Sequence, residues 1–303
     1  MRSRNVAGLI AQGAAISCFL ATACHAAGTL YAQELIRQAL SRHHNAVALL
    51  IDAKSSSDQE FVVIAVDGVR TIRSADRSEL GVLSGLTRVE PNAPGGQIRI
   101  EEPLKNVSGD TIGVLTAIFP QPEHPNAGGE LRTAINIQSE LSGRLSDEDN
   151  LFQPYPYNPT VSDETYAQAL LFKTMARHLE VLILAMHVAP PGRDKSLIIA
   201  CNVGRIGMAS DDDDMEVINT GKTTLKAMSE RSRVKIQLPM QDERGRTVGA
   251  LSEFFRYDDK ATREHYEAMA RVIRDELKSQ IHDKATLFRL LSDTSNSHSR
   301  LAP

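Results

Sequence analysis

The sequence predicts an α+β fold of two related domains, each an antiparallel sheet with a long N-terminal helix and a C-terminal helix. Three observations predict this fold: an internal repeat, paired apolar runs and recurring turn glycines. The segment Tyr31-Ala32-Gln33-Glu34-Leu35 returns as Tyr166-Ala167-Gln168-Ala169-Leu170, 135 positions later, and one inserted residue raises the shift to 136 further on. A repeat of this length is a whole domain rather than a solenoid unit. The repeated turn glycines are Gly109, Gly113, Gly245 and Gly249.

The chain begins with an export signal, predicted for residues 1–26. Two arginines precede an apolar stretch from about Val6 to Ala23, which ends in small residues. Cleavage after Ala23 or Ala26 gives a periplasmic or secreted protein; the alternatives are a lipoprotein acylated at Cys24 and an uncleaved anchor. No later run approaches the roughly 20 apolar residues that span a bilayer. We therefore expect no membrane span after removal of the signal.

In the first domain, residues 27–146, we expect helices at about 30–42 and 129–145. Its strands are expected at 49–51, 61–66, 98–101 and 111–119. An irregular helical middle separates the two strand pairs. A linker, 147–161, follows because Pro154, Pro156 and Pro159 oppose both helix and central strand.

The second domain, residues 162–285, repeats this order. Ser162-Asp163 supplies cap chemistry for a helix with apolar residues at helical spacing. Strands are predicted at 181–186 and 197–200, and again at 234–238 and 248–255, each pair joined by a turn signal. A helix at about 260–281 closes the domain, and 286–303 is predicted to be a polar tail.

Two segments of the second domain resemble the C-terminal half of a Cache domain. They are Asn219-Thr220-Gly221-Lys222 and the run from Val234 to Leu251, which contains a Pro-Met pair, an Asp-x-x-Gly hairpin and a Gly-Ala-Leu strand. The first domain matches through Glu102-Pro103-Leu104-Lys105 and 109–115 but lacks the Thr-Gly-Lys step. GAF and PAS domains use a similar Gly-x-x-Ile-Gly-x-Leu strand. The long leading helix, the paired strands after it and the export signal favour Cache.

The resemblance implies small-molecule sensing outside the cytoplasm by a PAS-like sheet. The chain departs from the family pattern because it shows no transmembrane anchor and no output domain. A membrane-bound sensor protein is therefore a candidate partner beside the small-molecule ligand. The net charge of −4 provides no basic field, so we expect no nucleic-acid partner.

The predicted ligand-binding residues lie in the second domain: His187, Asn202, Arg205 and Asp211. Asn202 and Arg205 approach the helical middle, which in Cache domains lies against the pocket. Arginine offers a planar fork to carboxylates or phosphates, although an ion pair with an acid such as Asp211 explains Arg205 equally well. The second domain is favoured because the first lacks the Thr-Gly-Lys step and inserts Pro91 to Gly96 before its hairpin. In the first domain the equivalent polar groups are expected to pair internally.

Other chemistry-bearing residues receive structural interpretations. The run Asp211 to Asp214 fits a capped helix start better than a calcium loop, which alternates its oxygen ligands around a turn glycine. His43 and His178 recur at helix ends, where cations favour the C-terminal dipole. Cys201, the one certain thiol of the mature fold, is expected to be a small buried hydrophobe.

Two functional classes remain open. One is a sensor-like ligand-binding protein; the other is a non-enzymatic interaction or scaffold component of a periplasmic complex. No nucleophile elbow, zinc pair or cysteine cluster occurs, so we expect no enzyme, no metal and no cofactor. Ligand binding requires a cavity lined by convergent polar side chains, whereas a scaffold predicts filled cores and an exposed apolar patch.

Overall fold

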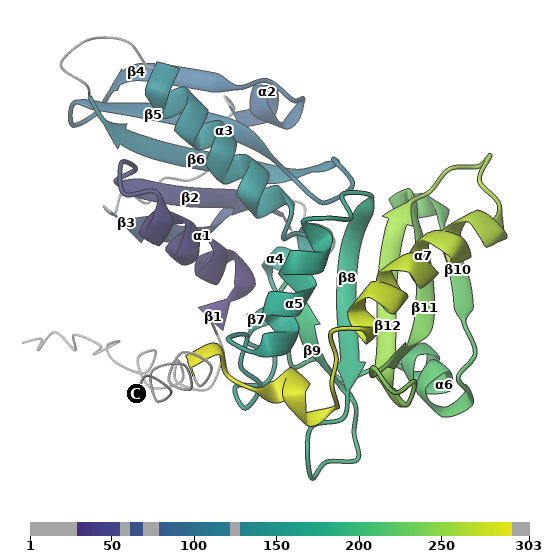
Figure 1. The fold of residues 1–303 in the computed structure, drawn as a ribbon. Coiled ribbons are helices and arrows are strands. Elements are labelled where there is room, and N and C mark those ends of the chain that lie inside the picture. The colour runs from purple at the N-terminus through teal and green to yellow at the C-terminus, as the bar shows by residue number, and fades with distance from the viewer. Residues whose placement is uncertain (1–28, 55–60, 69–78, 122–127, 293–303) are drawn as a thin grey trace, which may run out of the picture.

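The computed structural model describes residues 29–54, 61–68, 79–121 and 128–292. The predicted export signal, residues 1–26, therefore lies outside the described residues. The fold class predicted from the sequence is confirmed: the described chain is α+β, with two antiparallel five-stranded sheets, each flanked by a long N-terminal and a C-terminal helix (Figure 1).

The first domain opens with a two-residue strand β1 (Thr29–Leu30) and helix α1 (Tyr31–Arg42). Its sheet has the order β3-β2-β6-β5-β4. The strands are β2 (Ala48–Ala53), β3 (Val62–Gly68), β4 (Arg88–Ala93), β5 (Gln97–Lys105) and β6 (Thr111–Pro120). A short helix α2 (Glu79–Leu83) precedes β4, and α3 (Gly128–Ser142) closes the domain.

The second domain repeats this topology, with the sheet order β9-β8-β12-β11-β10. The strands are β8 (Val181–Val188), β9 (Leu197–Cys201), β10 (Thr224–Met228), β11 (Arg233–Gln241) and β12 (Thr247–Arg256). The helices are α5 (Tyr166–Met175), α6 (Asp212–Thr220) and α7 (Arg263–Lys278). Even the bulge after Leu104 in the first sheet recurs after Met240 in the second. The duplication predicted from the sequence is thus a duplication of topology and register.

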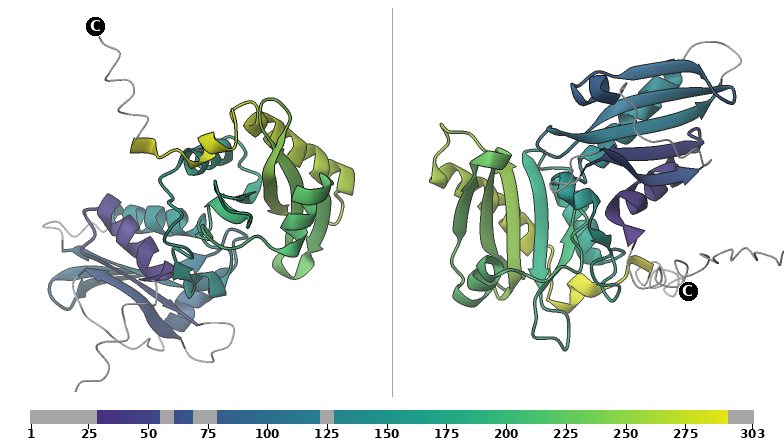
Figure 2. Two further views of the ribbon diagram at one scale, coloured as in Figure 1. Left: turned by 90° about the horizontal axis from the view of Figure 1, so that it is seen from below. Right: turned by 180° about the vertical axis from the view of Figure 1, so that it is seen from behind.

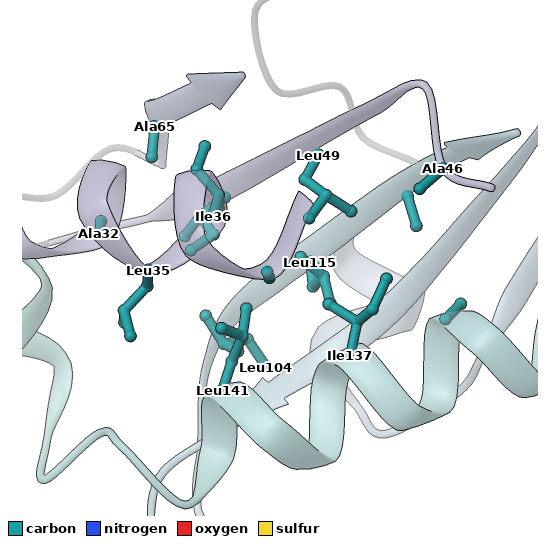
Figure 3. Close-up of a cluster of buried hydrophobic side chains, with 14 of the residues drawn as sticks. Ala32, Leu35, Ile36, Ala46, Leu49, Ala65, Leu104, Leu115, Ile137 and Leu141 are labelled. Atoms are coloured by element: carbon teal, nitrogen blue, oxygen red, sulfur yellow. The ribbon is translucent and has the colours of Figure 1, made fainter. Parts of the chain in front are cut away.

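The long helices pack on one face of each sheet and build its core. In the first domain, Leu35 and Ile36 of α1 and Ile137 and Leu141 of α3 meet strand side chains such as Leu115, and all five are fully buried (Figure 3). The second core repeats this arrangement between α5, α7 and the second sheet. The opposite sheet faces, seen from behind in Figure 2, are not used by these cores.

The four strands expected per domain become five, because each sheet gains an edge strand, β4 or β10. The segment from Pro91 to Gly96 is therefore no insertion: Pro91 lies in β4, and the following residues turn into β5. An edge strand tolerates proline because one side of it lacks a hydrogen-bonding neighbour. The alternation of apolar and polar residues is weak in this segment because an edge strand has a neighbouring strand on one side only.

The predicted linker and tail are ordered in part. Within 147–161, α4 (Glu148–Leu151) is capped by Asp147, and β7 (Pro154–Tyr155) pairs with β1. A 3-10 helix η2 (Ala285–Phe288) spans the start of the predicted tail, 286–303, and Leu287 is completely buried in the second core. The second domain therefore extends beyond residue 285.

The turn between β5 and β6 docks the first domain onto the second. Arg233 Nε donates to Ser108 Oγ at 2.6 Å, and Arg256 Nη2 donates to the Ser108 carbonyl at 2.9 Å. Arg233 is buried, and its Nη2 also donates to the Ser146 carbonyl at 2.5 Å. A hairpin of the first sheet is thereby anchored to the second domain.

Candidate functional site

The face of each sheet opposite the long helices carries polar side chains at equivalent positions. In the second sheet these are His187, Lys235, Gln237 and Ser252. In the first sheet the same positions hold Asp52, Arg99, Glu101 and Thr116. Strand residues two apart share a face, so each set converges on one surface of its sheet. Because a buried polar group is costly unless it is paired, such clusters deserve a functional or structural explanation.

In the second domain the cluster is closed around Asp214, at the start of α6. His187 Nδ1 lies 3.0 Å from Asp214 Oδ2, Gln237 Nε2 donates to Asp214 Oδ1 at 2.5 Å, and Ser252 Oγ donates to the same oxygen at 3.1 Å. Lys235 Nζ stands 3.8 Å from Oδ1. Asp214 is buried, and its carboxylate is fully surrounded by donors.

This environment fixes the ionisation of Asp214. Burial raises its pKa, but hydrogen bonding to His187 and the charges of His187 and Lys235 outweigh burial and lower the pKa far below its usual range. The capping box with Asp211 adds a further donor. Asp214 is therefore a carboxylate that pins α6 to three strands of the sheet.

In the first domain the equivalent face lines a cavity of about 150 Å³. Its polar lining comes from Asp52, Glu90, Gln97, Arg99 and Thr116, and its apolar lining from Leu50, Val63, Ala93, Pro94 and Ile118. Arg99 Nε lies 2.8 Å from Glu101 Oε1, and Arg88 approaches the other oxygen of Glu101 at 3.3 Å. The cavity thus has charged groups of both signs around an apolar floor.

Thr116 distinguishes this cavity from its second-domain counterpart. Its side chain is completely buried, and its hydroxyl has no hydrogen-bond partner among the described residues. The equivalent Ser252 donates to Asp214. A buried hydroxyl without a partner costs about 1 to 3 kcal/mol. A bound molecule that hydrogen-bonds to Thr116 would remove this cost.

The structure brings two of the four predicted ligand residues together and separates the others. His187 and Asp211 belong to the Asp214 cluster, where Asp211 Oδ2 lies 3.5 Å from Lys235 Nζ. Asn202 instead braces backbone: it accepts from the Leu184 amide and donates to the carbonyls of Gly143 and Leu182.

Arg205 also lies at the contact between the domains. Its Nη2 donates to Ser146 Oγ at 3.0 Å and lies 3.5 Å from Asp147 Oδ2. The ion pair considered from the sequence exists, but with an acid of the linker rather than with Asp211. Among the described residues, the polar cluster of the second domain pairs internally around Asp214, whereas that of the first domain lines a cavity.

Asp211, the histidines at the helix ends and Cys201 have structural roles in the described chain. Asp211 caps α6, as expected. The histidines at the helix ends pair with the closing helices: His43 Nε2 lies 3.1 Å from Glu140 Oε2, and His178 Nε2 lies 2.9 Å from Glu276 Oε2. Cys201 is buried.

Comparison with known proteins returns only weak similarities. No protein-family model matches the chain, and no curated protein matches it. The crystal structure of the second GAF domain of DevS from Mycobacterium smegmatis is similar at 17% identity, covering 37% of this chain and 94% of that chain, with a TM-score of 0.26.

Two longer structures are also similar. PelD 158-CT from Pseudomonas aeruginosa PAO1, in complex with c-di-GMP, matches at 14% identity over 85% of this chain and 79% of that chain, with a TM-score of 0.28. The bacteriophytochrome RpBphP3 from R. palustris matches at 9% identity over 80% of this chain and 70% of that chain, with a TM-score of 0.25. At these scores the similarity identifies no ligand.

Asp52, Arg99 and Thr116 were not among the residues predicted from the sequence. A signal was present for two of them: Arg99 alternates with apolar residues in strand 98–101, and Thr116 interrupts the apolar run of strand 111–119. Over the described ranges, no three His, Cys, Asp or Glu side chains converge as metal ligands would. Within the same ranges no helix combines the length and hydropathy needed to cross a membrane.

Proposed function

We propose that this protein is an exported, sensor-like binding protein of tandem Cache-like domains, without enzymatic activity, which takes a small ligand in the cavity of its first domain. The observation that carries the proposal is the cavity itself, with charged groups of both signs, an apolar floor and the buried Thr116 hydroxyl. Concave sites with a few convergent polar groups are the usual small-molecule sites of proteins.

The size and lining of the cavity restrict the ligand. Water occupies about 30 Å³ per molecule in the liquid, so a cavity of 150 Å³ accepts a molecule of only a few non-hydrogen atoms. Asp52 and Glu90 favour a cationic group, while Arg99 favours a carboxylate. A small amphoteric molecule, with an amine and a carboxylate, satisfies both.

Ligand binding in this cavity has a direct route to the second domain. Arg99 lies on β5 and Thr116 on β6, and the turn between these strands is held by Arg233 and Arg256. A shift of the hairpin on binding would therefore act on the docking contact at Ser108. This suits a protein that reports ligand occupancy to a membrane-bound partner.

The test is a thermal-shift screen of the purified mature chain with glycine, alanine, serine and β-alanine, repeated on Thr116→Val. A saturating ligand at 100 times its Kd adds about 2.7 kcal/mol to the binding domain. Thr116→Val removes the unpaired hydroxyl, so the apo protein should be equally stable or about 1 kcal/mol more stable. The ligand-induced shift should fall sharply in the variant.

The matched control is Ser252→Ala, at the equivalent position of the second domain. Ser252 hydrogen-bonds to Asp214, so this change should destabilise the apo protein by about 1 kcal/mol and leave the ligand-induced shift intact. A shift that survives Thr116→Val and disappears in Ser252→Ala would move the site to the second domain, near His187 and Asp211.

Export is tested by cell fractionation. The protein should be recovered outside the cytoplasm with its N-terminus cleaved after Ala23 or Ala26, or acylated at Cys24. Fatty-acid labelling that is lost in Cys24→Ser identifies the lipoprotein form. Recovery of the full-length chain from the cytoplasm would contradict export and leave the cavity proposal standing.

A further inference from the structure

A second hollow of about 380 Å³ lies between the two domains, away from the first-domain cavity. Its lining includes Arg144 of the first domain, Tyr155 of the linker, and Phe172, Cys201 and Ile206 of the second domain. We propose that this interdomain crevice binds a small monocarboxylate with an apolar body, whose carboxylate pairs with Arg144. The proposal is independent of the first-domain cavity.

Arg144 is a half-buried cation with spare donors. Its Nη1 donates to Gln38 Oε1 at 2.7 Å, and its Nε is buried without a hydrogen-bond partner. Within the described ranges no carboxylate lies within ion-pair distance of its guanidinium. Guanidinium presents five donors in a planar fork that matches a carboxylate. The guanidinium contacts two neutral groups, the Gln38 amide and the Tyr31 hydroxyl, and Glu34 acts on it only through its charge. A carboxylate paired directly with Arg144 is thus missing among the described residues.

The other polar groups of the crevice are occupied. Tyr155 donates to Asp163 at 2.7 Å, and Gln168 makes two hydrogen bonds to the backbone of Cys201. Glu140 pairs with the guanidinium and imidazole at the end of α1. Arg144 is thus the lining group left to recognise an anion. Glu140 and Asp163 would repel a second negative charge on the ligand, which favours a monoanion.

Comparison of the two domains shows that this cation is specific to the crevice. Gln280 stands at the position of Arg144, and Lys173 stands at the position of Gln38. The same hydrogen bond is present with its direction exchanged, since Lys173 Nζ donates to Gln280 Oε1 at 2.9 Å. Lys173 is exposed, whereas Arg144 is half-buried against the other domain. In the first domain the positive charge of this pair thus lies on the residue that lines the crevice, whereas in the second domain it lies on an exposed residue.

The walls of the crevice are partly aromatic and apolar. Tyr31 and Tyr155 have ring centroids 5.3 Å apart, and the Tyr31 hydroxyl donates to the Arg144 carbonyl. Phe172 keeps 47% of its surface exposed beside the crevice, while Ile206 is buried. An aromatic side chain at the mouth offers apolar contact to a ligand body. The combination of one guanidinium with apolar walls selects a carboxylate that carries a hydrophobic group.

Isothermal titration of the mature chain with benzoate and isovalerate tests the proposal. At least one should bind, whereas benzamide, the neutral analogue of benzoate, should bind at least about tenfold more weakly because hydrogen bonds to charged groups are the stronger ones. Phthalate, a dianion, should also bind more weakly than benzoate. In Arg144→Gln, which introduces the residue found at the equivalent position 280, the Kd should rise roughly tenfold or more.

Lys173→Gln is the matched control, because it removes the exposed cation of the equivalent pair and should leave the Kd unchanged. Phe172→Ala is a second variant that tests the apolar wall; its side chain is half exposed, so the apo fold should persist while carboxylate binding weakens. Absence of binding by both carboxylates, equal binding of benzamide and benzoate, or unchanged affinity in both Arg144→Gln and Phe172→Ala would overturn the proposal.

Discussion

At the scale of single residues, four equivalent positions have been given different chemistry in the two domains. The first domain holds Asp52, Arg99, Glu101 and Thr116 where the second holds His187, Lys235, Gln237 and Ser252. In the second domain Asp214 completes the set and satisfies its donors. The same sheet position is therefore a structural network in one domain and the lining of a cavity in the other.

Asp214 should be the most costly acid to remove from the second domain. Asp214→Asn replaces a buried carboxylate that faces His187 and Lys235, and it should lower the free energy of unfolding by about 3 kcal/mol at neutral pH, because partners are left without their counter-charge. The pKa of Asp214 is lowered in the folded state, so its contribution is fully present above the ordinary value of 3.8 and is lost as the pH falls below that value.

Urea unfolding at several pH values checks this expectation. The difference between the parent protein and Asp214→Asn should shrink as the pH falls below about 4. Asp213→Asn is the control, since Asp213 is half exposed and its lysine partner is 4.0 Å away. That change should stay within about 0.5 kcal/mol. Equal effects of the two substitutions would contradict the role assigned to Asp214.

At the scale of elements, the duplication preserves the contacts that fasten helices to sheets. Gln33 of α1 makes two hydrogen bonds to the backbone of Val66 in β3, and Gln168 of α5 makes the same two bonds to Cys201 in β9. A side-chain amide has both a donor and an acceptor, so it can pair with both groups of one backbone unit on an edge strand. Gln recurs in the sequence because in both domains it holds the first helix to an edge strand by two hydrogen bonds.

The ion pairs that join the first and last helices of each domain are repeated in the same way. Arg42 and His43 meet Glu140 in the first domain, and Arg177 and His178 meet Glu276 in the second. The sequence suggested interaction with the helix dipole at these positions. The structure shows instead a carboxylate on the closing helix, more than 90 residues away in the chain. Periodicity within one helix cannot reveal such a partner.

At the scale of the whole molecule, the two domains form contacts that need a glycine. Gly204 has φ +69°, and a Cβ built on it would lie 2.2 Å from Cζ of Tyr31, a fully buried residue of the first domain. The Tyr31 ring therefore rests directly on the backbone of the second domain. Since the space is filled by another domain, both the backbone conformation and the packing exclude a larger residue.

Gly204→Ala should therefore loosen the contact between the domains. We expect a loss of roughly 3 kcal/mol or more, from left-handed backbone strain together with overpacking against Tyr31. Gly192→Ala is the control, because Gly192 has φ +74° but open space around it, so strain alone should cost about 1 to 2 kcal/mol. Urea unfolding measures both. The same loss in both variants would mean that Tyr31 contributes nothing to the contact.

The sequence by itself determined the two-domain organisation, the helices that flank each sheet and the central strands. These features follow from local periodicity, turn residues and the repeat, all of which are properties of neighbouring positions. The same reasoning found the cap at Asp211, but it ended the strand at residue 186, whereas His187 lies within β8. The edge strands β4 and β10 were not predicted, because strands with one neighbour lack a strong apolar pattern.

Only the tertiary structure decided what each polar residue does. Arg205 and Asn202 serve the contact between domains, and Arg144, unremarkable in the sequence, faces a crevice. Asp52, Arg99 and Thr116 come from three strands and meet across more than 60 positions of the chain. The reason is physical: whether a polar side chain has a partner depends on groups brought near by folding, and the distance along the chain carries no information about them.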